Sequence, residues 1–382
     1  APALNFNALY LCIFICLKNK KYEMNMMFLL LSFSVLRDVK PEELGFTLPH
    51  EHLNMDFTHF YRRPPSRLNE KFNGKIELSN VGYVKQYPYS SKYNLILNDQ
   101  DAIGAVFNDL RDYKRCGGGT IVENSTYGLD RKTDFLMMVT QNYGGICKVV
   151  FGTGYYIADT QTRDFVIMDT EELYDCMRNE MTNMIAQYGS SKLRAGVIGE
   201  IASGWPIKDF ERNAIRAAAE LQQELKCGVS FHPHRTPEAP FEIMRLYLEA
   251  GGAADKAVMS HLDRTLLDED KLLEFAQLGT YCQHDLFGVE VSHYQLNVTT
   301  DMPSDAQRLD RMKLLANEGK VDRLLMSHDI HTKHRLIEFG GHGYSHILNN
   351  VLPVMKTKGF SKDDIKQITE KNPADWLAMS PN

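Results

Sequence analysis

The stretch LPHEHLNMDF, residues 48–57, ends an apolar run and carries His50 and His52 on either side of a glutamate. In an extended chain, side chains two positions apart point to the same face. A strand would therefore direct both imidazoles to one place, just where the chain enters a loop. This pattern indicates either a metal site or a pair of solvated histidines.

Seven further apolar or β-branched runs follow the same plan, each leading through polar residues into a helix-like segment. All eight runs are GFTLPHEH (45–52), GTIVENST (119–126), KVVFGTGY (148–155), AGVIGEIA (195–202), GVSFHPHR (228–235), KAVMSHLD (256–263), GTYCQHDLF (279–287) and DRLLMSHDI (322–330). Eight alternations of strand and helix predict an α/β fold, the (β/α)8 TIM barrel, with functional residues at the carboxyl ends of the strands.

The barrel is expected to span residues 41–380, with one long connection. Residues 54–100 are rich in Tyr, Asn, Pro and Lys and exceed an ordinary βα loop, so they predict a lid-like insertion after the first strand. Residues 1–40 form a leader with apolar runs at 8–17 and 24–36. Each run is shorter than the roughly 20 residues of a membrane helix. Basic residues precede the second run without an obvious cleavage site after it, so the leader is signal-like, fragmentary or mistranslated.

Charge and cysteine content exclude several functions. The net charge of -6 gives no basic surface for nucleic acid or anionic membranes. Seven cysteines lie scattered, without a CxxC pair, which is typical of reduced thiols. We therefore expect a cytoplasmic protein without a nucleic-acid or membrane partner, with secretion as the lesser alternative. A homodimer is compatible with these features.

Histidines and acids recur where the predicted strands end. They are His50, His52, Glu200, His232, His261 and Asp329. Strand ends of a TIM barrel converge, and crowding these groups together is costly unless cations lie between them. Imidazole and carboxylate suit zinc, manganese or iron, and the absence of cysteine ligands indicates a catalytic site. The sequence therefore predicts two divalent metal ions, with zinc expected first and manganese or iron as alternatives.

Longer motifs around these residues resemble the phosphotriesterase family of the amidohydrolase superfamily. They are HEH (50–52), IGEIASGWP (198–206), FHPH (231–234), SHLDRT (260–265) and HDIHTKHRLIEFGGHGYSHILNNVLP (328–353). The resemblance extends over about residues 41–377. It implies that His50, His52 and Asp329 hold the more buried metal, that His232 and His261 hold the more exposed one, and that Glu200 bridges both.

The expected chemistry is hydrolysis. Two metals about 3.5–4 Å apart share a water, lower its pKa and thereby supply a hydroxide nucleophile. Asp329 is the expected catalytic residue, because it can take the proton of this water and deliver it to the leaving group. The same scheme serves amides, lactones and phosphotriesters, so the loops must set the specificity.

The loops carry cations close to the ligands. Arg235 and Arg264 follow His232 and His261 closely, and His331 and Lys333 follow Asp329. At a pocket rim they favour an anionic substrate; the alternative is that they are ordinary surface charges. Arg264 is the strongest candidate, with Tyr156 as a supporting hydrogen-bond donor.

The animal branch of the family, which this sequence resembles, implies hydrolysis of N-acetyltaurine to acetate and taurine. A sulfonate suits a guanidinium donor, so the predicted partner is a small anionic N-acyl amide. Two alternatives remain open. One is a promiscuous phosphotriesterase or lactonase, which would prefer neutral esters. The other is a non-catalytic metal-binding protein.

Overall fold

The structure is a computed structural model that describes residues 32–33, 38–143, 146–188 and 191–379. Residues 8–17 and most of 24–36 lie outside this range, so the nature of the leader stays a prediction. Among the helices within the described range, none combines the length and the apolar character that a membrane span requires.

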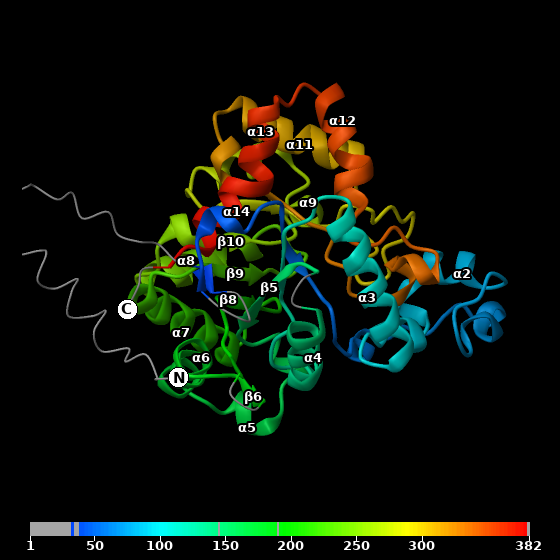
Figure 1. The fold of residues 1–382 in the computed structure, drawn as a ribbon, viewed down its shortest axis with the longest axis horizontal. Coiled ribbons are helices and arrows are strands. Elements are labelled where there is room, and N and C mark those ends of the chain that lie inside the picture. Colours follow the sequence, from blue (N-terminus) through cyan, green and yellow to red (C-terminus); the bar gives the residue numbers. More distant parts are fainter. Residues whose placement is uncertain (1–31, 34–37, 144–145, 189–190, 380–382) are drawn as a thin grey trace, which may run out of the picture.

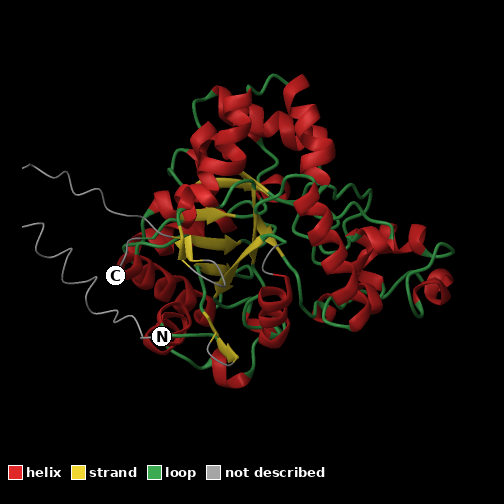
Figure 2. Cartoon of the chain, viewed as in Figure 1, coloured by secondary structure: helices red, strands yellow, loops and turns green. Residues whose placement is uncertain are grey.

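Eight parallel strands form the centre of the molecule (Figure 2). They are β3 (Thr47–Glu51), β4 (Thr120–Glu123), β5 (Lys148–Thr153), β8 (Val197–Ala202), β9 (Val229–His232), β10 (Ala257–Met259), β11 (Tyr281–His284) and β12 (Leu324–Met326). Each of these strands pairs with the next one along the chain, and all eight lie within the predicted runs. The predicted (β/α)8 barrel is confirmed.

The first and last barrel strands meet through hydrogen bonds at their carboxyl ends. The main-chain oxygen of His50 accepts from Ser327 Oγ at 2.8 Å and from the main-chain nitrogen of Asp329 at 3.2 Å. The nearly closed barrel therefore brings its first and last metal-ligand candidates side by side, although 279 residues separate them in the sequence.

Helices surround the strands on the outside (Figure 1). They are α2 (Val81–Gln86), α3 (Gln100–Arg115), α4 (Thr133–Tyr143), α5 (Arg163–Val166), α6 (Thr170–Thr182), α7 (Asp209–Leu225), α8 (Ala239–Glu249), α9 (Leu262–Thr265), α10 (Glu269–Ala276), α11 (Asp305–Asn317), α12 (Leu352–Thr357), α13 (Lys362–Lys366) and α14 (Asn372–Leu377). In α7, Ile215, Ala218 and Leu225 are buried at helical spacing, as periodicity predicts. Two short antiparallel pairs, β1 (Ser32–Phe33) with β2 (Asp38–Val39) and β6 (Ala186–Tyr188) with β7 (Ser191–Leu193), lie outside the barrel sheet.

An apolar layer fills one end of the barrel. Val122, Val150, Val197 and Val258 from four of the barrel strands cluster there with Trp376 of α14. The Trp376 indole nitrogen donates to a main-chain oxygen at 3.3 Å, so its polar atom is satisfied although the side chain is fully buried. This floor leaves the opposite, carboxyl end of the strands for polar side chains.

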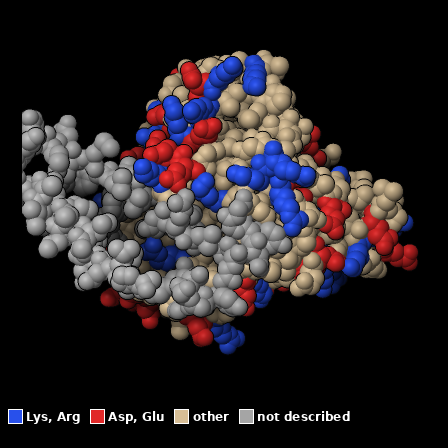
Figure 3. Space-filling view, viewed as in Figure 1, with Lys and Arg blue, Asp and Glu red and all other residues tan. Residues whose placement is uncertain are grey.

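The long insertion after β3 contains several short helices, including α2, and lies beside α3 (Figure 1). It is tied to the loop after β11, because the main-chain nitrogen of Tyr89 donates to Gln295 Oε1 at 3.0 Å. Its residues Phe57 and Tyr89 face the pocket described below. A lid movement of this insertion stays a prediction. On the face drawn in Figure 3, acidic and basic side chains are interspersed where grey atoms do not cover them.

Candidate metal centre

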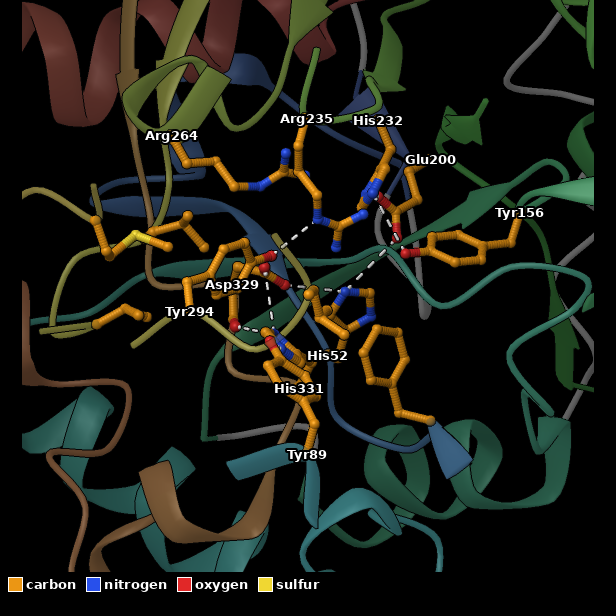
Figure 4. A pocket seen from close by; sticks show the side chains of 15 residues that line it. His52, Tyr89, Tyr156, Glu200, His232, Arg235, Arg264, Tyr294, Asp329 and His331 are labelled. Carbon is orange, nitrogen blue, oxygen red and sulfur yellow. Dashed lines mark hydrogen bonds and ion pairs between the residues drawn. The ribbon is translucent and has the colours of Figure 1, made fainter. Parts of the chain in front are cut away.

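His50 and His52 point to one place, as the alternation of side chains along a strand requires. His52 Nε2 lies 3.2 Å from Asp329 Oδ1 and 3.7 Å from Glu200 Oε1. His50 Nε2 lies 3.6 Å from Glu200 Oε2 and 3.8 Å from Asp329 Oδ1. These four residues at the ends of the first, fourth and eighth barrel strands therefore surround one small space. Figure 4 shows His52, Glu200 and Asp329 of this group.

His232 and His261 join the same cluster from the fifth and sixth strands. His232 Nδ1 lies 2.9 Å from Glu200 Oε2, and His261 Nε2 lies 2.9 Å from His232 Nδ1. Burial lowers the pKa of both imidazoles well below the ordinary value, so both rings are neutral and offer lone pairs. The structure thus brings all six predicted ligands together, with Glu200 between the two groups of histidines.

Other polar groups fix the orientation of the histidines from behind. Asp285 Oδ1 lies 2.6 Å from His261 Nδ1, and Ser260 Oγ lies 3.1 Å from His50 Nδ1. Ser125 Oγ lies 3.0 Å from His52 Nδ1. When these Nδ1 atoms donate, each Nε2 keeps its lone pair directed into the cluster, which is how metal-ligating histidines are usually held.

The cluster lacks the positive charge that its donors require. His50 Nε2 is buried and has no hydrogen-bond partner among the described residues. Burial raises the pKa of Glu200 well above its ordinary value. Burial opposes a charge on His52, but the hydrogen bond to Asp329 and the charge of Glu200 outweigh it and raise its pKa to about 9. Divalent cations between these donors would satisfy all three groups, so the residues fit a metal centre.

Donor atoms that could share an ion form overlapping groups. His50, His52 and Glu200 make one group, and Glu200, His232 and His261 make another, with the donor atoms of each group within 4.8 Å of one another. Glu200 belongs to both, which suits a bridging carboxylate. The set contains only imidazole and carboxylate donors, which zinc, manganese and iron accept.

Asp329 occupies a strained position above these groups. Its φ is 53° and that of His261 is 59°, both in the left-handed region that non-glycine residues rarely adopt. Burial opposes its charge, but His331 and the hydrogen bonds from His331 and His52 hold the pKa of Asp329 well below the ordinary value. The side chain is therefore an ionised carboxylate at the bottom of a pocket.

The pocket above the cluster contains two arginines (Figure 4). Arg264 is buried and donates to Thr265 Oγ1 at 3.2 Å and to the main-chain oxygen of Pro233 at 3.4 Å. Arg235 Nε donates to the hydroxyl of Tyr294 at 3.0 Å. Neither guanidinium forms an ion pair with a carboxylate in the described part of the chain. Two guanidinium groups without a carboxylate partner among the described residues thus line the pocket.

Tyr156 lies on the opposite side of the same pocket. Its hydroxyl is 3.3 Å from His232 Nε2, and its ring packs edge to face on that imidazole with centroids 5.0 Å apart. The hydroxyl therefore holds a ligand candidate in place, and it also reaches the pocket.

Lys333 lies elsewhere, which corrects the expectation of a pocket contact. Its ammonium group pairs with Asp99, the N-cap residue of α3, and lies 3.4 Å from the ring centroid of Tyr93. The side chain is fully buried and does not line the pocket. Its charge anchors the insertion and α3 to the loop after β12.

Sequence reasoning did not select three residues that matter here. Asp285 orients His261, and Tyr89 and Tyr294 complete the pocket wall together with His331, which was expected at the rim. A signal for Asp285 existed, because it stands at the end of the seventh strand, two positions after Gln283, where alternation points it to the barrel centre. The two tyrosines belong to irregular loops without a periodic signal.

Comparison with known proteins agrees with this geometry. The sequence profile of the phosphotriesterase family matches residues 33–377. The phosphotriesterase-related protein of Aedes aegypti is 53% identical over 345 residues, which cover 89% of this chain and 96% of that protein. A resiniferatoxin-binding protein from Rhodobacter sphaeroides has a similar fold, with a TM-score of 0.83, 24% identity and coverage of 91% of this chain and 94% of that one. An organophosphorus hydrolase from Deinococcus radiodurans gives a TM-score of 0.70 at 25% identity, covering 94% and 100% of the two chains.

Proposed function

The chain belongs to the phosphotriesterase family of metal-dependent hydrolases, and on that premise we propose that it is an amidase for small anionic N-acyl amides. N-acetyltaurine is the foremost candidate substrate, with acetate and taurine as products. We propose zinc as the metal, with manganese or iron as alternatives. Five described cysteines are free thiols, which supports a reducing compartment such as the cytoplasm.

One observation carries this proposal: Arg235 and Arg264 face the pocket without a carboxylate partner among the described residues. A buried guanidinium without a counter-ion is unfavourable, so a substrate anion that pairs with it is strongly favoured over a neutral group. A sulfonate or carboxylate on the amine side of the substrate supplies that anion.

The aromatic residues next to the cluster support a small acyl group. The ring of Phe57 lies 5.0 Å from that of His331 and 6.4 Å from that of Tyr156, measured between centroids. All three side chains line the pocket close to the ligand candidates. An acetyl group fits beside such rings more easily than a long acyl chain.

We assign each group of site residues a separate role in the proposed reaction. Divalent cations held by the six ligand residues supply Lewis acidity and a water of lowered pKa when bound. Asp329 accepts the proton of the attacking water and carries it to the leaving nitrogen. His331 Nδ1, at 3.3 Å from Asp329 Oδ2, keeps this carboxylate oriented. Arg235 and Arg264 bind the anionic end of the substrate.

The test compares three matched amides on the metal-loaded protein. N-acetyltaurine, N-acetyl-β-alanine and N-acetylethanolamine differ only in the sulfonate, carboxylate or hydroxyl at one end. We expect kcat/KM to be about 10- to 100-fold higher for the two anions, the value of one charge-assisted contact. Equal rates for all three would contradict anion recognition.

A phosphotriesterase or lactonase activity is the second candidate. The similarity to an organophosphorus hydrolase favours it, since the same cluster can activate a phosphoryl or lactone carbonyl group. This activity would be indicated if an aryl phosphotriester or a lactone were turned over faster than every amide tested. Stoichiometric metal binding without any hydrolysis would instead indicate a metal-binding protein.

A further inference from the structure

A second cavity, of about 360 Å³, lies behind one wall of the metal pocket. We call it the rear cavity; it is formed by residues 85–89, 288–294 and 331–342. The two spaces share four lining residues, the aromatic Tyr89, Tyr294 and His331 and the aliphatic Val289. Its size falls within the range of cavities that bind small organic molecules.

The shared wall is a layer of aromatic rings (Figure 4). Tyr89 and Tyr294 meet edge to face with centroids 6.3 Å apart. His331 stacks on Tyr89 with centroids 6.0 Å apart, and its Nε2 lies 3.0 Å from the Tyr89 hydroxyl. None of the six ligand candidates is among the described residues that line the rear cavity.

Charge in the rear cavity is predominantly positive. Lys85, on α2, is exposed and forms no ion pair with any described residue. Glu290 is the one acidic side chain among the described lining residues, and its Oε1 accepts a hydrogen bond from the main-chain nitrogen of Asp305 at 3.0 Å. The carboxylate of Glu290 is thus bound to the first residue of α11, and no ion pair joins it to Lys85.

Arg335 adds a buried positive charge. Its guanidinium donates to the main-chain oxygens of Asp329 at 2.7 Å and Phe287 at 2.9 Å, and its Nε lies 3.4 Å from His342 Nε2. Within the described residues no carboxylate is at ion-pair distance from it. Carbonyl and imidazole partners satisfy its donors, and Asp329 and Glu51 stabilise its charge from beyond ion-pair distance. An anion in the cavity would add to that stabilisation.

The remaining lining is apolar or accepts hydrogen bonds. Pro88, Val289 and Val291 stand with the two tyrosines around the cavity. His334 uses Nδ1 toward Asn94 Oδ1 at 3.2 Å, while its Nε2 has no hydrogen bond to any described residue. A ligand that matches this surface carries an apolar body and an anionic end.

We propose that the rear cavity binds a small organic carboxylate with an aromatic or aliphatic body, its carboxylate directed toward Arg335 and Lys85. Inorganic phosphate would leave the apolar wall uncovered, and an organic cation would meet two positive charges. A neutral apolar molecule would leave Lys85 without a counter-ion. The lining of the rear cavity contains none of the six ligand candidates, whereas four of them line the metal pocket.

Arg335 joins the rear cavity to Asp329, the proposed catalytic residue, through a hydrogen bond. The main-chain oxygen of Asp329 accepts hydrogen bonds from Arg335 Nη1 at 2.7 Å and from His331 Nδ1 at 2.8 Å. A carboxylate that draws Arg335 toward the cavity would weaken one of these bonds and shift Asp329. Turnover should therefore change when the rear cavity is filled; this consequence rests on the proposed function, whereas binding does not.

Calorimetric titration of the metal-loaded protein with phenylacetate tests the proposal, with phenylacetamide as the uncharged match. We expect the amide to bind about tenfold more weakly, the value of one charge-assisted hydrogen bond. Val291→Trp fills the cavity and should weaken phenylacetate binding by a similar factor. Val298→Trp, on the same loop but 72% exposed, is its control and should have no effect.

Lys85→Glu tests the charge without altering the packed wall, with Lys362→Glu on the exposed surface of α13 as its control. Weaker binding only in the Lys85 variant supports the site. Equal affinity for the acid and the amide, or full binding by the Val291 and Lys85 variants, would overturn it. So would displacement of phenylacetate by removal of the metals, which would place it at the metal centre. These outcomes do not depend on whether any amide is hydrolysed.

Discussion

His261 is held by Asp285 through two separate contacts. Asp285 Oδ1 lies 2.6 Å from the Nδ1 of His261 and also accepts a hydrogen bond from the main-chain nitrogen of His261 at 3.1 Å. One carboxylate thus fixes both the ring and the left-handed backbone of a ligand candidate, whose φ is 59°. Asp285 contacts Nδ1 of His261, whereas Nε2 of the same ring faces His232. Asp285 therefore orients His261.

Asp285→Asn should lower metal affinity by about 10- to 100-fold, the usual cost of losing a partner behind a metal ligand. The amide keeps the size of the side chain but loses the charge that fixes the proton on His261 Nδ1. Competition with a chelator during zinc titration measures the change. Asp310→Asn, at a carboxylate that is 63% exposed, is the matched control. Unchanged zinc affinity would show that Asp285 only supports the fold.

The barrel and the clustering of the ligand candidates were predictable from the sequence, because both depend on local patterns. Strand alternation places His50 and His52 on one face, and the convergence of strand ends brings Glu200, His261 and Asp329 to them. The same alternation applies to Gln283 and Asp285, whose side chains do meet, with Gln283 Nε2 at 2.8 Å from Asp285 Oδ2. His284 between them, which is more conspicuous in the sequence, points the other way and is buried.

The pocket wall was not predictable, because it depends on contacts between irregular segments. Tyr89 reaches the pocket because its main chain is bound to Gln295, 206 residues away. No periodic pattern in either loop encodes that contact. Lys333 shows the converse error: its position four residues after Asp329 suggested the pocket rim, but Asp99 at the start of α3 binds it first.

Arg264→Gln should raise KM for N-acetyltaurine by about 10- to 100-fold, the value of one charge-assisted contact. The change for N-acetylethanolamine should be small, because that amide carries no charge. The reversal Arg264→Glu should enlarge the difference, and Arg235→Gln should resemble Arg264→Gln. Steady-state kinetics on both amides provide the comparison, with the exposed Arg178→Gln as control. Equal effects on the two substrates would remove Arg264 from substrate binding.

Asp109→Asn should make the protein more stable than the wild type at alkaline pH. Asp109 is buried in α3, and burial together with the charges of Asp112 and Glu338 raises its pKa from the ordinary 3.8 to about 7. Between these values the folded protein holds a proton that the unfolded chain has lost, so stability falls as pH rises. The variant has no carboxyl group to ionise at this position, so it does not lose this part of the free energy of unfolding. The loss in the wild type amounts to at most about 3 kcal/mol between pH 5 and 8.

Urea unfolding of the Asp109 variant and the wild type at pH 5 and pH 8 measures this effect. The free energy of unfolding of Asp109→Asn relative to wild type should increase from pH 5 to pH 8. Asp310→Asn, at an exposed carboxylate on α11, should show no comparable trend. A difference between variant and wild type that is the same at both pH values would mean that Asp109 ionises normally in the folded protein.

Glu200→Gln tests whether one carboxylate serves both groups of histidines. The amide has nearly the same shape but no negative charge, so it cannot balance two cations. Because Glu200 contacts both groups, we expect the bound metal to fall below two equivalents. Acetate release from N-acetyltaurine should fall by more than about 100-fold, beyond the cost of losing an outer partner such as Asp285.

Metal analysis and acetate release on the same samples separate the roles of Glu200. Loss of metal together with loss of activity supports a bridging ligand. Full metal content with low activity would instead give Glu200 a part in the reaction without a part in assembling the site. Glu200 Oε2 lies 2.9 Å from His232 Nδ1, and no other described carboxylate touches that atom, so no other acid can replace it there. Full metal content with full activity would therefore exclude both the role of Glu200 in binding metal and its role in the reaction.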